Sequence, residues 1–276
     1  MMARLLRALG VYALLTAASL IMIGPLAVML LGSLTPDEHV LASVGRLDFC
    51  PGELSLQNYA DVFHRVPFWV YLRNSFLINA VIVLAGSVVN GFAGYALARL
   101  RWRGRKLLLG LVMALLIIPF EVIAVPLFFQ LSFLGWRNTL LVQAAPFVAH
   151  PLAIYLFYTF FLGFPRELEE AARVDGAGVL RTFFQIVLPN SKPAFASVAI
   201  VTFLFCWGMY LWPLLMTTAE NVRPLPLGIA GFHTLPPLAW GDILAFGVMM
   251  IAPVLLVFVL LQRWFVRGVA TTGLGG

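Results

Sequence analysis

Long apolar runs separated by short polar segments make up most of this chain. Six runs approach or exceed the ~20 residues that a helix needs to cross the hydrocarbon core of a bilayer. They lie at approximately 11–32, 70–98, 106–131, 138–162, 190–216 and 243–266. We therefore predict an all-α integral membrane protein with six transmembrane helices, built as a single transmembrane domain over residues 1–276. The first run follows Arg4 and Arg7 as a signal peptide would, but it is long and no small-x-small cleavage site follows it, so we expect a retained anchor.

One polar segment, residues 163–189 between the fourth and fifth runs, carries helix signals of its own. Pro165 can open a helix, and the glutamates that follow it suit the positive end of a helix dipole. Gly176 can supply the left-handed residue that ends such a helix. Pro189 suits the first turn of the next membrane helix, where a proline loses no helical hydrogen bond. The pattern predicts a short helix that is too polar to enter lipid.

Composition and charge agree with a membrane protein. Hydrophobic residues form 62% of the chain and charged residues 11%, against roughly 25% charged in soluble domains. The net charge of +6 does not indicate nucleic-acid binding, because the arginines fall in short groups beside the apolar runs. With six spans and both ends inside, 13 of the 18 basic residues fall on one side. The positive-inside rule then places both termini and the 163–189 segment in the cytoplasm, and the 33–69 loop outside.

The sequence contains no motif for catalysis or metal binding. It has no Gly-x-x-x-x-Gly-Lys-Ser/Thr phosphate loop, no Gly-x-Ser-x-Gly and no His-Glu-x-x-His. Cys50 lies in the predicted outer loop and Cys206 inside a span, so we expect no disulfide between them. The chain is therefore expected to be no enzyme, with no catalytic residue and no metal site, and its energy must come from another polypeptide.

Four side chains inside the apolar runs are candidates for a translocation pathway. Glu121, between Pro119 and Pro126, is the only acidic residue well within a predicted span, and a charged group there must face protein, water or a permeant. A packing role between helices and a pathway-lining role both remain open for it. Trp207, Tyr210 and Trp212 form an aromatic group in the fifth run, and aromatic faces suit sugar rings. Trp212 near the outer end also fits an interfacial aromatic belt.

Small and polar residues recur along the second run. We interpret them as sites of close helix packing and of hydrogen bonds between helices. They are Asn79, Gly86, Ser87, Asn90, Gly91 and Gly94.

The polar segment also carries a family resemblance. Glu170-Ala171-Ala172, then Gly176 after three residues, then Ile186-x-Leu188-Pro189 after nine more, is similar to the cytoplasmic signature of permease subunits of ABC importers. The resemblance implies that this segment couples the permease to an ATPase. The implied coupling residues are Glu170, Ala171, Ala172, Asp175, Gly176, Ile186, Leu188 and Pro189.

Further stretches narrow the resemblance to carbohydrate importers of the maltose and glycerol-3-phosphate type, and to the smaller, six-span permease of such systems. They are Asn74-Ser75, the run from Gly94 to Arg99, Pro119-x-Glu121-Val122, the run from Leu134 to Thr139, and Gln262-Arg263. Two departures, Trp207-Gly208 in place of Trp-Asn and the glycine-rich ending at 273–276, leave the solute open. A sugar, a trehalose-like disaccharide, glycerol-3-phosphate and a glycerophosphodiester all remain possible.

The resemblance implies a permease that works by alternating access in a bacterial plasma membrane. Its implied partners are a second permease in a heterodimer, two ATPase subunits that use ATP and Mg, and an extracytoplasmic solute-binding protein; this chain itself would bind no cofactor. The alternative from another class is a secondary carrier or channel with Glu121 as an ion or proton site. That alternative leaves the Glu-Ala-Ala segment unexplained, and no inverted repeat is detectable.

Overall fold

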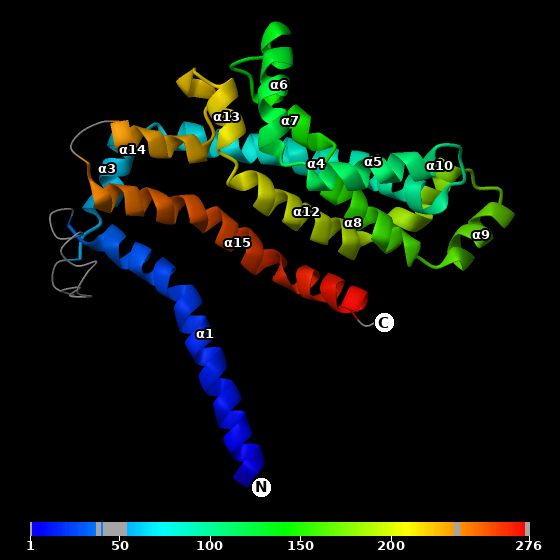
Figure 1. Ribbon diagram of the computed structural model, residues 1–276, viewed down its shortest axis with the longest axis horizontal. Coiled ribbons are helices and arrows are strands. Elements are labelled where there is room, and N and C mark those ends of the chain that lie inside the picture. Colours follow the sequence, from blue (N-terminus) through cyan, green and yellow to red (C-terminus); the bar gives the residue numbers. More distant parts are fainter. Residues whose placement is uncertain (1, 37–39, 41–53, 235–237, 274–276) are drawn as a thin grey trace. The chain divides into compact units, whose positions relative to one another are not determined.

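The computed structural model describes residues 2–36, 40, 54–234 and 238–273, with side chains described over 7–36, 40, 54–232 and 238–261. These residues form helices and turns and contain no strand (Figure 1). They divide into two compact units, residues 1–68 with 228–253 and residues 69–227 with 254–276. Predictions that concern Cys50 or the glycine-rich ending at 274–276 lie outside the described residues.

The first unit is held by polar contacts between short and long helices. It contains α1 (Met2–Leu34), α3 (Gln57–Arg65), α14 (Ala230–Thr234) and the first part of α15 (Trp240–Gly273). The buried amide of Asn58 donates to the carbonyls of Ser33 at 2.9 Å and Thr35 at 2.8 Å, which fixes α3 against the end of α1. Arg65 forms a 2.8 Å ion pair with the buried carboxylate of Asp242.

The second unit contains the remaining long apolar helices. Its principal elements are α4 (Phe68–Arg99), α5 (Arg105–Ile117), α6 (Phe120–Phe133), α7 (Leu140–Val148), α8 (Pro151–Leu162), α9 (Arg166–Val174), α10 (Val179–Thr182), α11 (Leu188–Asn190), α12 (Lys192–Trp207) and α13 (Leu211–Met216). Within this unit α8 packs on both α5 and α12, and α13 packs on α6 and α7. Figure 1 shows α9 at one end of these helices and α6 and α13 at the other.

The membrane spans agree with the predicted runs in part. Within the described residues, four helices are long and apolar enough to cross a bilayer: Arg7–Leu34, Phe68–Arg99, Leu140–Leu162 and Trp240–Leu261. The third predicted run contains a bend, with α5 and α6 meeting at 103°. The fifth run begins at a second bend, where the segment Val179–Asn190 meets α12 at 79°. By length and composition, the described residues therefore contain four candidate spans, or up to six if each bent pair crosses once.

The α4 helix packs closely on α7 and α8 through its small and polar residues, as the sequence predicted for most of them. A Cβ added at Gly94 would lie 2.5 Å from Cβ of Phe157, so only glycine permits this approach. The Asn90 amide donates to Val148 O at 3.0 Å and accepts from His150 N at 3.0 Å, which satisfies the backbone where α7 ends and α8 begins. Asn79 differs, because its amide nitrogen donates within α4, to Ser75 O at 2.9 Å.

Candidate coupling and translocation sites

The α9 helix forms and ends by the local signals that its sequence contains. Pro165 is its N-cap residue, and Glu167 and Glu169 lie in its first turn, where carboxylates stabilise the positive end of the dipole. At the other end Gly176 has φ +75°, the left-handed conformation that the sequence predicted. Its N–H donates to Arg173 O at 3.0 Å. The chain therefore turns sharply after one short helix.

The two faces of α9 differ in exposure. Glu169 and Ala172, three residues apart, are buried at 5% and 7% exposure and face the rest of the unit. Glu170, Ala171 and Asp175 are exposed. The family resemblance implied a coupling role for Ala172, and the structure packs its side chain within the chain.

A buried ion pair joins α9 to the end of α4. Arg99 Nε lies 3.0 Å from Glu169 Oε1, and the two side chains are 5% and 6% exposed. Charges this deeply buried are retained only when they are paired, and loss of one partner leaves the other uncompensated. Sequence reasoning did not single out Glu169. The sequence signal that could have identified Glu169 is its three-residue spacing to Ala172, which places both residues on one helix face.

The segment that follows α9 is helical but irregular. It passes from α10 through a π-helical turn, η2 (Phe183–Val187), into α11. The ring of Phe183 stacks on Phe92 with centroids 4.4 Å apart and also contacts Tyr95 at 5.1 Å, so the turn is anchored on α4. Pro189 lies in the first turn of α11, while the apolar helix α12 begins three residues later, at Lys192. Ile186 and Leu188 are half-buried and Pro189 is exposed.

Apolar side chains are nevertheless exposed on this polar part of the molecule. Val174 at the end of α9 is 88% exposed, and Leu180 and Phe184 after it are 65% and 51% exposed. We call Val174, Val179, Leu180 and Phe184 the apolar strip. Grouped exposed apolar side chains on a polar segment are typical of protein-binding surfaces.

Glu121 does not lie in the middle of a straight helix. It occupies the first turn of α6, directly after the 103° bend at Ile118 and Pro119, and its side chain is exposed. The N-terminus of α6 favours a carboxylate at this position. The packing interpretation of Glu121 within this chain is therefore not supported by its surroundings.

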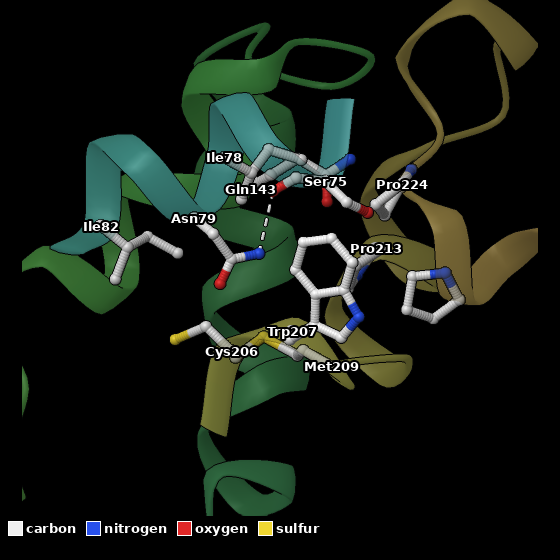
Figure 2. Close-up of a pocket in the computed structure, with 11 residues that line it drawn as sticks. Ser75, Ile78, Asn79, Ile82, Gln143, Cys206, Trp207, Met209, Pro213 and Pro224 are labelled. Atoms are coloured by element: carbon white, nitrogen blue, oxygen red, sulfur yellow. Dashed lines mark hydrogen bonds between the residues drawn. The ribbon is translucent and has the colours of Figure 1, made fainter. Parts of the chain in front are cut away.

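Trp207 lines a small cavity in the second unit. Its indole is 3% exposed and contacts the rings of Phe76 and Phe203 at 5.0 and 5.1 Å. Figure 2 shows the indole beside Asn79 and Met209 in this cavity, which has a volume of about 10 Å³. Tyr210 follows at the break between α12 and α13 and is 39% exposed.

Trp212 is fully buried, so its ring faces neither lipid nor a pathway in this structure. Its Nε1–H donates to Val142 O at 2.9 Å, and the rings of Phe120 and Phe147 pack against it at 5.8 and 6.4 Å. The carbonyl of Val142 would normally accept from the residue four positions on, which is Pro146 and has no N–H. The indole therefore supplies the hydrogen bond that the proline removes.

A polar cluster at the beginning of α4 fixes the segment after α13. The Asn74 amide donates to the carbonyls of Asn221 and Arg223, each at 2.9 Å. Ser75 Oγ accepts from Leu225 N at 2.7 Å. In the sequence, Asn74-Ser75 contributed only to the family resemblance. Its structural role could not be predicted, because the groups that bind Asn74 and Ser75 lie some 150 residues away.

These features define the class of protein: a helical membrane protein with four to six spans, in which a short polar helix with exposed apolar neighbours stands between apolar helices. The family model for the inner membrane component of binding-protein-dependent transport systems matches residues 90–271, and the chain belongs to that family.

Individual relatives agree with this family. The chain is 34% identical over 253 residues to the arabinooligosaccharides transport system permease protein AraQ of Halalkalibacterium halodurans, covering 91% of both chains. It is 32% identical to the sn-glycerol-3-phosphate transport system permease protein UgpE of Yersinia pestis, covering 90% of this chain and 91% of the relative. It is 32% identical to the trehalose/maltose transport system permease protein MalG of Thermococcus litoralis, covering 80% and 82%.

A solved structure shares the fold. A chain from a bacterial ABC transporter involved in the import of the acidic polysaccharide alginate superposes with a TM-score of 0.79, at 23% identity, over 94% of this chain and 97% of that one. The protein is thus a permease subunit of an ATP-driven ABC importer, and separate subunits hydrolyse the ATP. Membership implies an inner-membrane location and, as partners, another permease, an ATPase and a solute-binding protein.

Proposed function

We propose that this chain is the six-span permease of an importer for a carbohydrate or a glycerophosphate-type solute, and that α9 with the turn after it couples ATP hydrolysis to transport. The relatives described above, which are 32–34% identical to this chain, are named as permeases of transport systems for arabinooligosaccharides, sn-glycerol-3-phosphate and trehalose or maltose. Their names support this solute class. The whole chain would form one transmembrane domain in a heterodimer with a second permease, above two ATPase subunits.

The coupling proposal rests on one observation: α9 has one buried face and one exposed face. The buried side is tied to α4 through Arg99 and Glu169, and the exposed side presents Glu170, Ala171 and Asp175 beside the apolar strip. A partner that moves the exposed side therefore also moves α4. The remaining coupling residues, Gly176, Ile186, Leu188 and Pro189, shape the turn and the segment that leads to α12.

The test uses two glycines that lie in open space two residues apart. Gly176 has φ +75°, whereas Gly178 has φ −73° and ψ 169°, an extended conformation that valine adopts readily. Gly176→Val should lower ATPase co-purification and solute-stimulated ATP hydrolysis at normal membrane yield, and Gly178→Val should leave both close to wild type. Wild-type values for both variants would remove the coupling proposal.

We also propose that the termini and α9 face the cytoplasm. The distribution of 13 basic residues on one side supports this orientation. Ala177 lies just beyond α9, so in a Cys50→Ser background Ala177→Cys should react with an impermeant thiol reagent only after the cells are opened. Labelling in intact cells would reverse the orientation.

For the translocation pathway we propose Glu121, Trp207 and Tyr210, with Trp212 holding the neighbouring wall in position. The exposed carboxylate of Glu121 and the half-exposed ring of Tyr210 can meet a hydroxylated solute. The cavity at Trp207 is far too small for a sugar, so under alternating access α4 and α12 must separate before a solute reaches the indole. Thermal-shift screening of the cognate binding protein against sugars, glycerol-3-phosphate and glycerophosphodiesters would identify the solute.

A further inference from the structure

A large pocket lined mainly by charged side chains lies at the end of the second unit where α9 stands (Figure 1). Its volume is about 430 Å³, within the roughly 300–1,000 Å³ that is typical of ligand sites. The end of α4, the start of α5, the end of α8 and α9 all contribute to its lining. Five of the lining residues are arginines: Arg99, Arg101, Arg105, Arg166 and Arg173. We call this site the basic pocket.

The basic pocket has an excess of positive charge. Glu169 and Glu170 are its two acidic residues, so the five arginines leave a formal charge of +3. Glu169 is already paired with Arg99 at 3.0 Å. Among the described side chains, the remaining lining arginines form no ion pair. Like charges gathered in one pocket repel one another, so an anion that enters the basic pocket is stabilised there.

The loop that carries part of this charge is held in place by its own side chains. Trp102 Nε1 donates to Ala96 O at 3.3 Å, and Arg105 Nη2 donates to Ala98 O at 3.2 Å. These contacts satisfy carbonyls in the last turn of α4, which have no partner within the helix, and fold the 100–104 loop back onto the helix end. The backbone of the basic pocket is therefore formed before any ligand binds.

The surroundings of the basic pocket favour a lipid over a soluble anion. Leu162 lines the pocket at the end of α8 and is 49% exposed. Leu107 and Leu108, at the start of α5, are 70% and 42% exposed. Trp102 in the adjoining loop is 41% exposed, and tryptophan favours the depth of the lipid headgroups. Basic pockets beside the ends of membrane helices are suited to phospholipid headgroups, with the acyl chains against the apolar helix faces.

We propose that the basic pocket binds the phosphate group of an anionic phospholipid. Arginines of α9 and of the 100–104 loop donate to the phosphate oxygens, which the planar guanidinium group matches in geometry. The acyl chains lie beside the exposed leucines of α5. The bound lipid thereby joins α9 to the ends of α4 and α5 in addition to the Arg99–Glu169 ion pair. The proposal depends neither on the solute that the importer carries nor on the coupling role of α9.

The experiment is native mass spectrometry of the assembled importer, titrated with phosphatidylglycerol and, as the neutral lipid, phosphatidylcholine. The wild type should retain phosphatidylglycerol in preference. Arg101→Gln with Arg166→Gln should weaken that binding roughly thirtyfold, at about fivefold for each arginine. The matched control, Arg103→Gln with Lys106→Gln, removes the same charge from exposed positions outside the lining. Its affinity should stay within about threefold of wild type at physiological salt, which screens charges away from the site.

The two double variants decide between a built site and general surface charge. Equal affinities of the two for phosphatidylglycerol would overturn the proposal, as would equal retention of both lipids by the wild type. Arg101→Lys with Arg166→Lys keeps the charge and should recover most of the affinity, because lysine still binds phosphate as a point charge. A lysine variant as weak as the glutamine variant would assign the two arginines a structural role only and would also contradict the proposal.

Thermal unfolding in phosphatidylcholine nanodiscs separates a lipid phosphate from a soluble one. Adding phosphatidylglycerol to the nanodiscs should raise the Tm of the wild type but not that of the Arg101→Gln, Arg166→Gln variant, since a ligand stabilises only the protein that binds it. Millimolar inorganic phosphate should leave both Tm values unchanged. An equal rise with inorganic phosphate would assign the basic pocket to a soluble anion and overturn the lipid assignment.

Discussion

The ion pair between Arg99 and Glu169 gives the sharpest quantitative expectation. Glu169→Gln keeps the shape of the side chain but removes the charge that compensates a guanidinium with 5% exposure. Breaking a buried pair by removing one partner costs about 3–5 kcal/mol. Glu167→Gln, at an exposed position in the same helical turn, should lose only the dipole contribution of about 0.3–1 kcal/mol.

Hydrogen exchange of the α9 amides measures this difference locally. At 1.4 kcal/mol per factor of ten, Glu169→Gln should speed exchange by about a hundredfold to several thousandfold if α9 opens without global unfolding. Glu167→Gln should change the rate by less than about tenfold. Equal rates in the two variants would refute the argument that the pair holds α9. The double variant Arg99→Met with Glu169→Met should recover protection, since an apolar pair of similar volume replaces a buried ion pair at little cost.

Three further tests concern the faces of α9, the hydrogen bond of Trp212 and the role of Glu121. Ala172→Trp should reduce the yield of folded protein because its site is buried. Ala171→Trp, on the exposed face, should fold normally and weaken ATPase co-purification. A low yield for Ala171→Trp and a normal yield for Ala172→Trp would contradict the faces assigned to α9. Trp212→Phe should cost about 1–3 kcal/mol for the orphaned carbonyl and lower Tm, while Trp240→Phe, at 37% exposure, should have little effect. Similar Tm values would exclude the hydrogen bond as the cause. Glu121→Gln should alter uptake without loss of assembled complex, and unchanged uptake would remove Glu121 from the pathway.

Local signals explain what the sequence predicted well. The α9 helix and its left-handed turn depend on Pro165 and Gly176, which act on their own neighbours, so a reader of the sequence can place them. The close approach at Gly94 was predictable for the same reason, since small residues in an apolar helix have few other uses. The apolar runs were found because their length and hydropathy are properties of the segment itself.

The rest depended on contacts between distant parts of the chain. Arg99 and Glu169 are 70 residues apart, and nothing near either one identifies the other. An interfacial, a pathway and a core tryptophan have the same local sequence pattern, so the burial of Trp212 could not be inferred. Pro119 was visible in the third run, but a proline permits a gentle kink as well as the 103° bend that the chain adopts.

The hydrogen bond from Trp212 to Val142 makes the effect of a mutation at Trp212 depend on what residue 146 is. Restoring an N–H there with Pro146→Ala would let α7 satisfy its own carbonyl, after which the indole nitrogen has no acceptor to serve and smaller aromatic residues at 212 become tolerable. Substitutions at the two positions should therefore be epistatic, with the proline change opening the way for the tryptophan change but not the reverse. Substitutions at this core are therefore tolerated in one order, with Pro146 replaced before Trp212, and engineered variants of the permease would have to follow that order.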